Sequence, residues 1–379
     1  MGPLKGLKII EIAGVGPGQF AGMLLADMGA NVVRVERPVN AEPIFAAHAR
    51  FNIMNRSRPS IGVDLKTPRG VQLVLDLCVE ADAIFEGFRP GVMERLGLGP
   101  DACMQRNPKL VYGRMTGWGQ QGPLAETVGH DANFIGLAGV YGAIGEKGGN
   151  PVYPLNLVGD MGGGGAYLVI GLLAAMLEAS RSGRGQVIDA AMVDGAASQM
   201  ASIWGFKAAG AWQDERGSNS LDGGAPFYTA YRTRDGLHMA VAPIENRFYR
   251  NLLDVLGITD IDPARQHDRS QWAHVRQRIQ AVFATRTRDE WCERLEGTQT
   301  CCTPILNLSE AATHPHNVAR ETFVSVDGVT QPAPAPRFSR TQSAISSAAG
   351  TLHPDLIAVL RDWGASDEIL ANIPRESQA

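Results

Sequence analysis

The chain has 379 residues, of which 44% are hydrophobic and 20% are charged, and its formal net charge at pH 7 is −4. These values predict an ordinary soluble protein of two or three domains, and they exclude a general electrostatic attraction to nucleic acid or to anionic membranes. The five cysteines lack the spacing of a zinc site, and the first residues lack a signal-peptide pattern. We therefore expect a cytoplasmic protein without a structural metal, and neither nucleic acid nor a membrane as a partner.

The first part of the chain alternates short β-rich runs with helical patterns. Strands are expected at residues 8–12, 31–36, 61–65, 83–86 and 110–114, with helices at 20–28 and 68–79. This alternation predicts an α/β domain with a Rossmann-like open parallel sheet. A dinucleotide fingerprint would need a third glycine at position 19, which is Gln19. Arg37 follows the second strand, so a phosphate group is a better candidate ligand there than NAD.

A glycine-rich stretch stands in the middle of the chain, where Asp160 and Met161 precede four glycines, 162–165, and an apolar run, 166–177. One interpretation is a bare first helical turn whose free N–H groups face an anion, with Asp160 as a catalytic carboxylate. The other is that the glycines only permit close helix packing and that Asp160 caps the helix. The apolar run ends at Glu178, short of the roughly 20 residues that a bilayer requires, so a buried helix is expected.

The pattern changes in the second half of the chain. A strand at 186–191 and a mostly apolar helix at 195–212 lead to a hairpin at 227–241, helices at 246–256, 270–284 and 288–296, and a strand at 303–306. The Asp-Gly turn of the hairpin supports a small α+β domain. We expect a large domain at 1–190, a linker helix and loop at 191–224, the small domain at 225–330, and at 331–379 a proline-rich linker and a C-terminal helix that returns to the large domain.

Several stretches together resemble the family III CoA-transferase (CaiB/BaiF) superfamily, and within it the branch of racemases that act on 2-methylacyl-CoA thioesters. The matching stretches are Leu7–Pro38, Val63–Lys66, Glu86–Val92, Gly113–Pro123, Gly129–Asp131, Leu155–Gly164, Gly183–Asp189 and Leu221–Tyr228. The resemblance implies an interlocked homodimer, an acyl-CoA thioester as substrate and no cofactor.

The resemblance also implies roles for three residues. His130 and Asp160 would be the two acid/bases that exchange the α-proton through an enolate, and Glu245 from the partner subunit would orient His130. Without the resemblance, His130 beside Asp131 is more often a surface pair or a satisfied core histidine, and Glu245 is equally well a helix N-terminal acid. In the transferases of the superfamily, the residue at the place of Asp160 is instead a nucleophile that forms an acyl-enzyme anhydride.

The remaining expected site residues would contact the CoA or the acyl group. They are Arg37, Val63, Asp64, Leu65, Lys66, Arg89, Gly129, Asp131, Ala132, Asn133, Phe134, Gly159, Met161, Gly162, Gly163 and Gly164. Arg37 and Arg89 are the candidates for the phosphates, because a guanidinium group pairs with phosphate in a bidentate manner. Ala132 and Phe134 replace the isoleucine and tyrosine usual in the family, which predicts a wider pocket with one hydroxyl fewer and leaves the acyl chain open.

Overall fold

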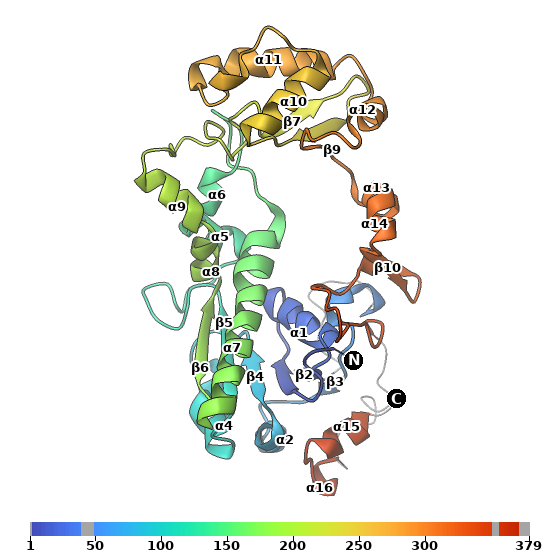
Figure 1. Ribbon diagram of the computed structural model, residues 1–379. Coiled ribbons are helices and arrows are strands. Elements are labelled where there is room, and N and C mark those ends of the chain that lie inside the picture. The colour runs from blue at the N-terminus through green and yellow to red at the C-terminus, as the bar shows by residue number, and fades with distance from the viewer. Residues whose placement is uncertain (1, 39–48, 351–355, 371–379) are drawn as a thin grey trace. The chain divides into compact units, whose positions relative to one another are not determined.

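The computed structural model describes residues 2–38, 49–350 and 356–370 and contains two compact units (Figure 1). The first unit takes its described residues from Met1–Ala138, Leu155–Gln199 and His316–Ala379, and the second consists of Gly139–Pro154 and Met200–Pro315. Each unit therefore draws on segments that are far apart in the sequence, and the units begin and end at other residues than the domains expected above.

The first unit is built on a sheet of six parallel strands in the order β3-β2-β1-β4-β5-β6. The strands are β1 (Lys8–Ile12), β2 (Asn31–Glu36), β3 (Ser60–Gly62), β4 (Ala83–Glu86), β5 (Val111–Thr116) and β6 (Val187–Ala191). This confirms the expected α/β fold with an open parallel sheet. The order reverses between β1 and β4, and the crevice at such a reversal is where open α/β sheets bind ligands.

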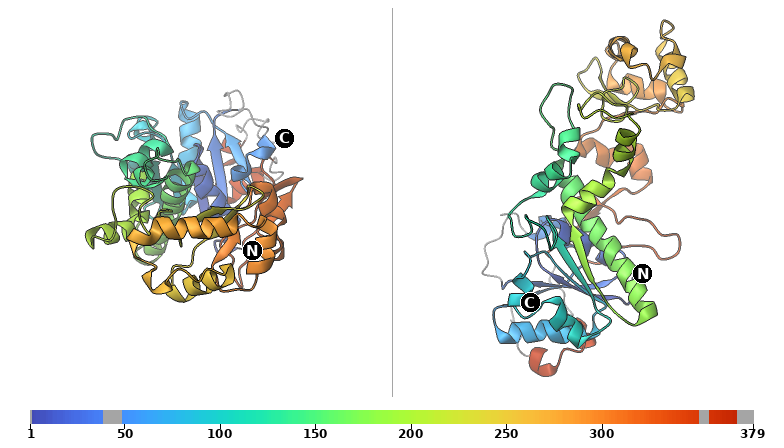
Figure 2. Two further views of the ribbon diagram at one scale, coloured as in Figure 1. Left: turned by 90° about the horizontal axis from the view of Figure 1, so that it is seen from above. Right: turned by 90° about the vertical axis from the view of Figure 1, so that its left-hand side faces the viewer.

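Helices cover both faces of this sheet (Figure 2). Successive side chains of a strand point to opposite faces, so Ile9 packs in one core with α1 (Pro17–Asp27) and α7 (Tyr167–Ser182). Its neighbour Ile10 packs in the other core with three further helices: α2 (Pro68–Glu80), α4 (Pro100–Arg106) and α15 (Leu356–Asp362). The sequence predicts the C-terminal helix near residues 353–363, and the first of these, 353–355, lie outside the described residues.

The glycines of the glycine-rich stretch are helical. The turn η3 (Leu155–Leu157), which is kinked at Asn156, is followed directly by the π-helical segment η4 (Val158–Ala166) and by α7. In the part of the chain that the structure describes, this run of 28 residues, Leu155–Ser182, is the one helix long and apolar enough to cross a bilayer, and 39% of its most apolar window is buried. A core helix of a soluble protein has the same length and composition, so the feature alone favours neither environment.

The first unit also holds shorter elements. They are η1 (Ala49–Phe51), η2 (Ile53–Asn55), α3 (Val92–Arg95), α5 (Asp131–Leu137), α8 (Met192–Gln199), β10 (Phe323–Val326), β11 (Val329–Pro332) and α16 (Asp367–Leu370), and α14 (Pro315–Ala319) lies at its boundary. β10 and β11 form an antiparallel hairpin. The buried Arg56 donates to the Gln331 side chain at 2.9 Å and to the Pro332 carbonyl at 2.8 Å. These hydrogen bonds attach the hairpin to the first unit.

The second unit contains a three-stranded antiparallel sheet in the order β7-β8-β9. Its strands are β7 (Thr229–Arg232), β8 (His238–Val241) and β9 (Cys302–Pro304), and its helices are α6 (Val140–Ala143), α9 (Ala201–Ala208), α10 (Asn246–Leu256), α11 (Trp272–Phe283), α12 (Arg288–Leu295) and α13 (Leu308–Thr313), with short turns η5 (Pro263–Arg265) and η6 (Arg269–Gln271). The long helix expected at 195–212 is divided at Met200 into α8 and α9, which belong to different units.

Candidate active site

The loops that carry the expected site residues of the first unit follow the carboxyl ends of its strands. Arg37 comes directly after β2, Val63–Lys66 after β3, Arg89 after β4 and Gly129–Phe134 beyond β5. Because the strands are parallel, these ends share one edge of the sheet, the edge at which such folds bind ligands. Arg37 and Arg89 are both exposed. The structure thus gathers most of the expected residues on one edge.

Asp160 lies against the loop that follows the central strand β1. A Cβ atom built on Gly16 would stand 3.0 Å from Asp160 Oδ2. Gly16 has a φ of 64°, a conformation that glycine adopts at little cost, so the loop can approach the carboxylate closely. Asn156 Nδ2 donates to Asp160 Oδ2 at 3.0 Å. These contacts fix the half-buried carboxyl group at the edge of the sheet where the strand order reverses.

The surroundings of Asp160 favour its protonated form. Burial raises the pKa of the Asp160 carboxyl above its ordinary value, and the negative charge of Asp131 raises it further. The hydrogen bond from Asn156 and the nearby His130 act in the opposite direction without cancelling the rise in pKa. A carboxyl group whose pKa is raised is suited to proton transfer near neutral pH.

His130 is the N-cap residue of α5 and is exposed. Its backbone N–H donates to Asn133 Oδ1 at 3.0 Å, and its carbonyl accepts from the backbone N–H groups of Asn133 and Phe134. The start of the helix is therefore closed around His130 by Asn133, which was expected to contact the ligand. His130 is close enough to Asp160 for its charge to act on that carboxyl group, so the structure brings the two expected acid/bases into one cluster.

The glycines of η4 serve close packing. Cβ atoms added at Gly163, Gly164 and Gly165 would lie 2.6 Å from Ala196 N, 2.9 Å from Pro17 Cβ and 2.6 Å from Pro17 O, respectively. All three glycines are buried against α8 or α1. They stand inside a continuous helical segment, where backbone N–H groups are used by the helix itself. This arrangement matches the packing interpretation and offers no bare first turn to an oxyanion.

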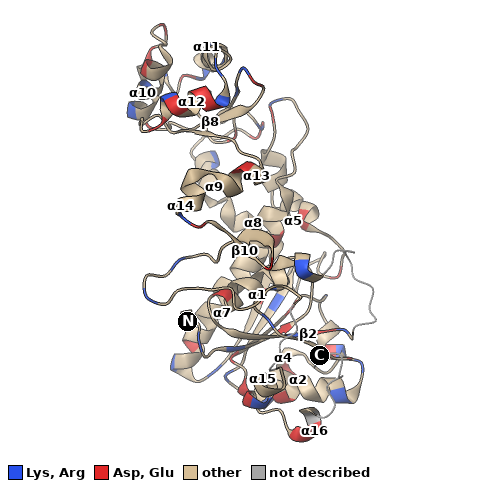
Figure 3. Cartoon of the chain, turned by 90° about the vertical axis from the view of Figure 1, so that its right-hand side faces the viewer, with Lys and Arg blue, Asp and Glu red and all other residues tan. Residues whose placement is uncertain are grey.

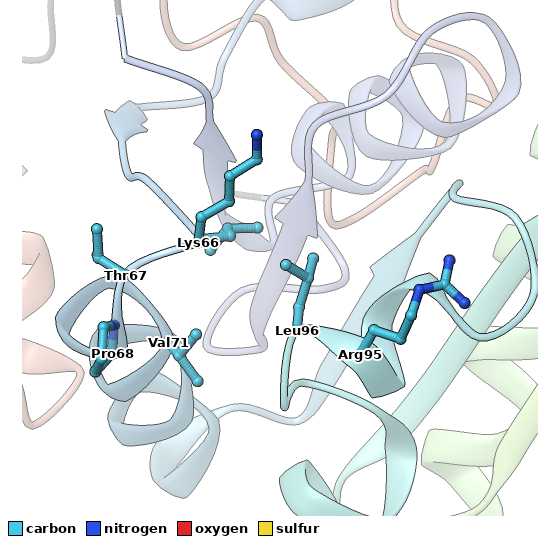
Figure 4. A pocket seen from close by; sticks show the side chains of 7 residues that line it. Lys66, Thr67, Pro68, Val71, Arg95 and Leu96 are labelled. Atoms are coloured by element: carbon cyan, nitrogen blue, oxygen red, sulfur yellow. The ribbon is translucent and has the colours of Figure 1, made fainter.

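A pocket of about 300 Å³ lies between the start of α2 and the end of α3 (Figure 4). Its lining residues are Leu65, Lys66, Thr67, Pro68, Val71, Arg95 and Leu96. Leu65 and Lys66 belong to the expected set, whereas Arg95 was missed, because an arginine at the end of a short helix has no distinguishing sequence pattern. Lys66 lies beside the N-terminus of the 13-residue helix α2, a position that favours a phosphate group, whereas the Arg95 guanidinium points away from α2 (Figure 4) and lies near Gly91.

A second, mostly apolar pocket of about 510 Å³ lies beside α5 and is lined by Trp118, Thr127, Val128, Ala132, Asn133, Gly136 and Leu137. Ala132 therefore lines an open space, as its small size suggested. Phe134 does not line it: this ring is 4% exposed and packs edge-on against Trp118, with 4.7 Å between the ring centroids. The hydroxyl group of the tyrosine usual at position 134 would therefore lie in the core of this structure and not in the pocket.

Glu245 belongs to the second unit, where it is the exposed N-cap residue of α10. The loop before it is held by Gln266, which is 3% exposed and whose Nε2 donates to the carbonyls of Pro243 and Ile244, both at 2.9 Å. Gln266 was not foreseen, because it lies 21 positions further along the chain. The relation of Glu245 to His130 stays a prediction.

Charged residues of both signs are mixed along both units (Figure 3), so positive charge for an anionic ligand comes from local groups such as Lys66 and Arg95. Among the described residues, no group of three or more His, Cys, Asp or Glu side chains is placed to hold a metal ion.

The comparisons with known proteins agree with one another. The model of the family described as CoA-transferase family III matches residues 4–355. The chain is 43% identical to the α-methylacyl-CoA racemase of Mus musculus, covering 96% of this chain and 94% of that protein, and 41% identical to the racemase of Homo sapiens, covering 89% and 87%. The crystal structure of a CaiB/BaiF family protein from Brucella suis has a TM-score of 0.78 at 27% identity and covers 96% of this chain and 99% of that one.

Proposed function

Because this chain belongs to CoA-transferase family III, we propose that it is an isomerase that interconverts the (R) and (S) forms of a 2-methylacyl-CoA thioester. The two racemases that are 43% and 41% identical over most of the chain support this reaction class. The single structural observation that supports the proposal is the hydrogen bond of 2.6 Å from the Asp160 N–H to the side chain of Asp131, the residue that follows His130, because it holds the two candidate residues in one cluster.

The chemistry requires two groups of this kind. The α-hydrogen of a thioester is weakly acidic, so one base must remove it while an acid on the opposite face of the carbon supplies the replacement. A carboxyl group that holds its proton more tightly than usual and an imidazole can exchange these two roles in the two directions of the reaction. His130 and Asp160 are our candidates for this pair.

The enolate oxygen needs hydrogen-bond donors, and removing one such donor typically costs roughly 3–4 kcal/mol of transition-state stabilisation. The sequence suggested the N–H groups of the glycines 162–165, but these glycines lie within a helical segment. Of the first N–H groups of α5, those of Asn133 and Phe134 already donate to the carbonyl of His130, whereas those of Asp131 and Ala132 have no acceptor within their own helix. They are the alternative donors in this proposal.

We assign the CoA phosphates to the cationic edge of the first unit. Lys66 and Arg95 line one pocket there, and Arg37 and Arg89 follow β2 and β4, the two strands that flank β1. The apolar pocket that Ala132 lines would receive part of the acyl-pantetheine chain. The reaction needs no cofactor, because the thioester itself acidifies the α-hydrogen.

A homodimer and a cytoplasmic location are also part of the proposal. Exposed apolar side chains along one helical run, Leu155, Leu157, Ile170 and Leu177, are between 55% and 64% exposed and are suited to contact a second copy. Within such a dimer, Glu245 would orient His130. Sedimentation equilibrium tests the dimer: a monomer at micromolar concentration would contradict it, and association with lipid vesicles would assign the apolar run to a membrane.

The decisive experiment is isotope exchange. Incubation with an (R)-2-methylacyl-CoA in heavy water should place deuterium at C2 and form (S) product, and the His130→Ala and Asp160→Ala variants should lose both. Retention of protium at C2 by the wild-type protein, under conditions in which it binds the ester, would refute the proposal.

The second candidate is CoA transfer between carboxylic acids, favoured by the description of the family and by the half-buried carboxyl group of Asp160, which could act as a nucleophile. It predicts an acyl-enzyme that hydroxylamine traps and a turnover that depends on an acceptor acid. A His130→Ala variant with full turnover would favour this candidate over the racemase.

A further inference from the structure

Asp131 connects the two candidate acid/bases. It follows His130 in the chain, is 3% exposed, and its Oδ2 accepts the backbone N–H of Asp160 at 2.6 Å. Asp131 is thus joined to His130 through the main chain and to Asp160 through a hydrogen bond of its side-chain carboxylate. The resemblance to the family suggested only that Asp131 contacts the substrate.

We propose that Asp131 is a positioning residue, which holds Asp160 at a fixed place relative to His130, and that its side chain is not a ligand of the thioester. The inference deepens the proposed function and rests on it, because positioning has a catalytic effect only if His130 and Asp160 act on one substrate.

The space around the carboxylate supports this role. A Cβ atom added at Gly159 would stand 2.5 Å from Asp131 Oδ2 and 3.0 Å from the side chain of Ile135. The carboxylate therefore occupies the volume that Gly159 leaves free. Its second oxygen, Oδ1, is buried and has no hydrogen-bond partner among the described atoms. A group enclosed in this way has no open face for a ligand, but it can fix the backbone that it touches.

The same contact has an electrostatic effect on Asp160. Burial is the main reason that the pKa of Asp160 is raised, and Asp131 is the neighbouring charge that raises it. Asn156 and His130 lower this pKa. The loop before α1 presents Gly16 to the carboxyl group, and α8 packs on the following glycines through its backbone and Gln199. Removing the charge of Asp131 while keeping its hydrogen bond should therefore lower the pKa of Asp160.

The Asp131→Asn variant makes this separation, because its amide oxygen can still accept the Asp160 N–H. We expect the acid limb of the pH profile of C2 exchange to move to lower pH, with KM for the CoA ester changed less than twofold. The Asp131→Ala variant should lose about 100-fold in kcat, as expected when a reacting group is misplaced, again with little change in KM. A tenfold or larger rise in KM with an unmoved pH profile would identify a substrate ligand and overturn the inference.

A titration that needs no activity separates this inference from the proposed function. The ¹³C signal of the Asp160 carboxyl, assigned with an Asp160→Asn variant, should titrate at lower pH in Asp131→Asn than in the wild-type protein. An unmoved titration overturns the inference even if the wild-type protein racemises normally. A moved titration upholds the contact between the two residues even if the wild-type protein shows no exchange.

The Gly159→Ala variant tests the same contact from the other side. Its added methyl group would displace the Asp131 carboxylate, so kcat should fall to a similar extent as in Asp131→Ala while KM is kept. Gly205→Ala is the matched control, since nothing lies within 4 Å of a Cβ atom on this exposed helical glycine. A Gly159→Ala protein with wild-type kcat would overturn the inference.

Discussion

The Glu86→Gln substitution should change how the stability of the protein depends on pH. Glu86 ends β4 and is 3% exposed. Its Oε2 accepts the backbone N–H of Phe88 at 2.6 Å, and Arg114 Nε lies 3.7 Å from its Oε1. Burial outweighs these partners and raises the pKa of Glu86 from 4.5 to about 7. The folded state therefore binds this proton more tightly than the unfolded chain does.

The sign and size follow from this difference in pKa. The contribution of the protonated group to stability is complete below pH 4.5 and is lost as the pH rises through about 7. The difference between a pKa of 4.5 in the unfolded chain and about 7 in the folded protein corresponds to about 3 kcal/mol. Between pH 4.5 and pH 8, the unfolding free energy of the wild-type protein should therefore fall by about 3 kcal/mol relative to that of the Glu86→Gln variant.

Urea unfolding followed by circular dichroism at half-unit pH intervals measures this difference. The exposed Glu126 supplies the control, because Glu126→Gln should run parallel to the wild-type protein over the whole range. If the Glu86→Gln and wild-type curves also ran parallel, burial of Glu86 would not govern its ionisation and the reasoning would be refuted.

Three further predictions concern other contacts. Arg95→Ala should raise KM for the CoA ester roughly tenfold with kcat unchanged, because it loses one phosphate contact of about 1.4 kcal/mol. Steady-state kinetics measures this effect, with Arg181→Ala, at an exposed arginine on α7, as the control. Equal KM values for the Arg95→Ala variant and the wild-type protein would remove Arg95 from the CoA site. Gly163→Ala should destabilise the fold by about 1–3 kcal/mol, because its Cβ would stand 2.6 Å from Ala196 N. The control Gly205→Ala should not destabilise it. Equal melting temperatures of the two variants would contradict the packing role of Gly163. Gln266→Ala should lower racemisation to the level of Glu245→Gln, because two carbonyl groups of the loop before Glu245 lose their donor; full activity would show that this loop does not need the contact.

The regular elements of both units could be predicted because their signals are local. The expected strands at 31–36 and 83–86 and the helix at 246–256 have the bounds that the structure gives to β2, β4 and α10. Apolar alternation and helical periodicity repeat within a few residues, so neighbours in the chain are sufficient to detect them. The glycine-rich stretch has no such signal, since glycine favours neither helix nor strand.

The chemistry of the cluster could be predicted only in part. The resemblance to the family suggested His130 and Asp160 as candidates, and in the structure the residue after His130, Asp131, accepts the backbone N–H of Asp160. Arg95 and Gln266 were missed, because each acts on a segment that is distant in the sequence. The oxyanion donors expected at 162–165 were inferred from the run of glycines alone. Such a run does not reveal that α1 and α8 pack against that segment.

The sequence by itself determined the parallel sheet, the family and the identity of the two candidate acid/bases, because periodicity and motifs are written in consecutive residues. Only the tertiary structure decided that the glycines serve packing, that Phe134 is a core residue and that Asp131 is directed at the backbone of Asp160. These outcomes depend on which atoms meet within about 3 Å, and that is set by the packing of segments far apart along the chain.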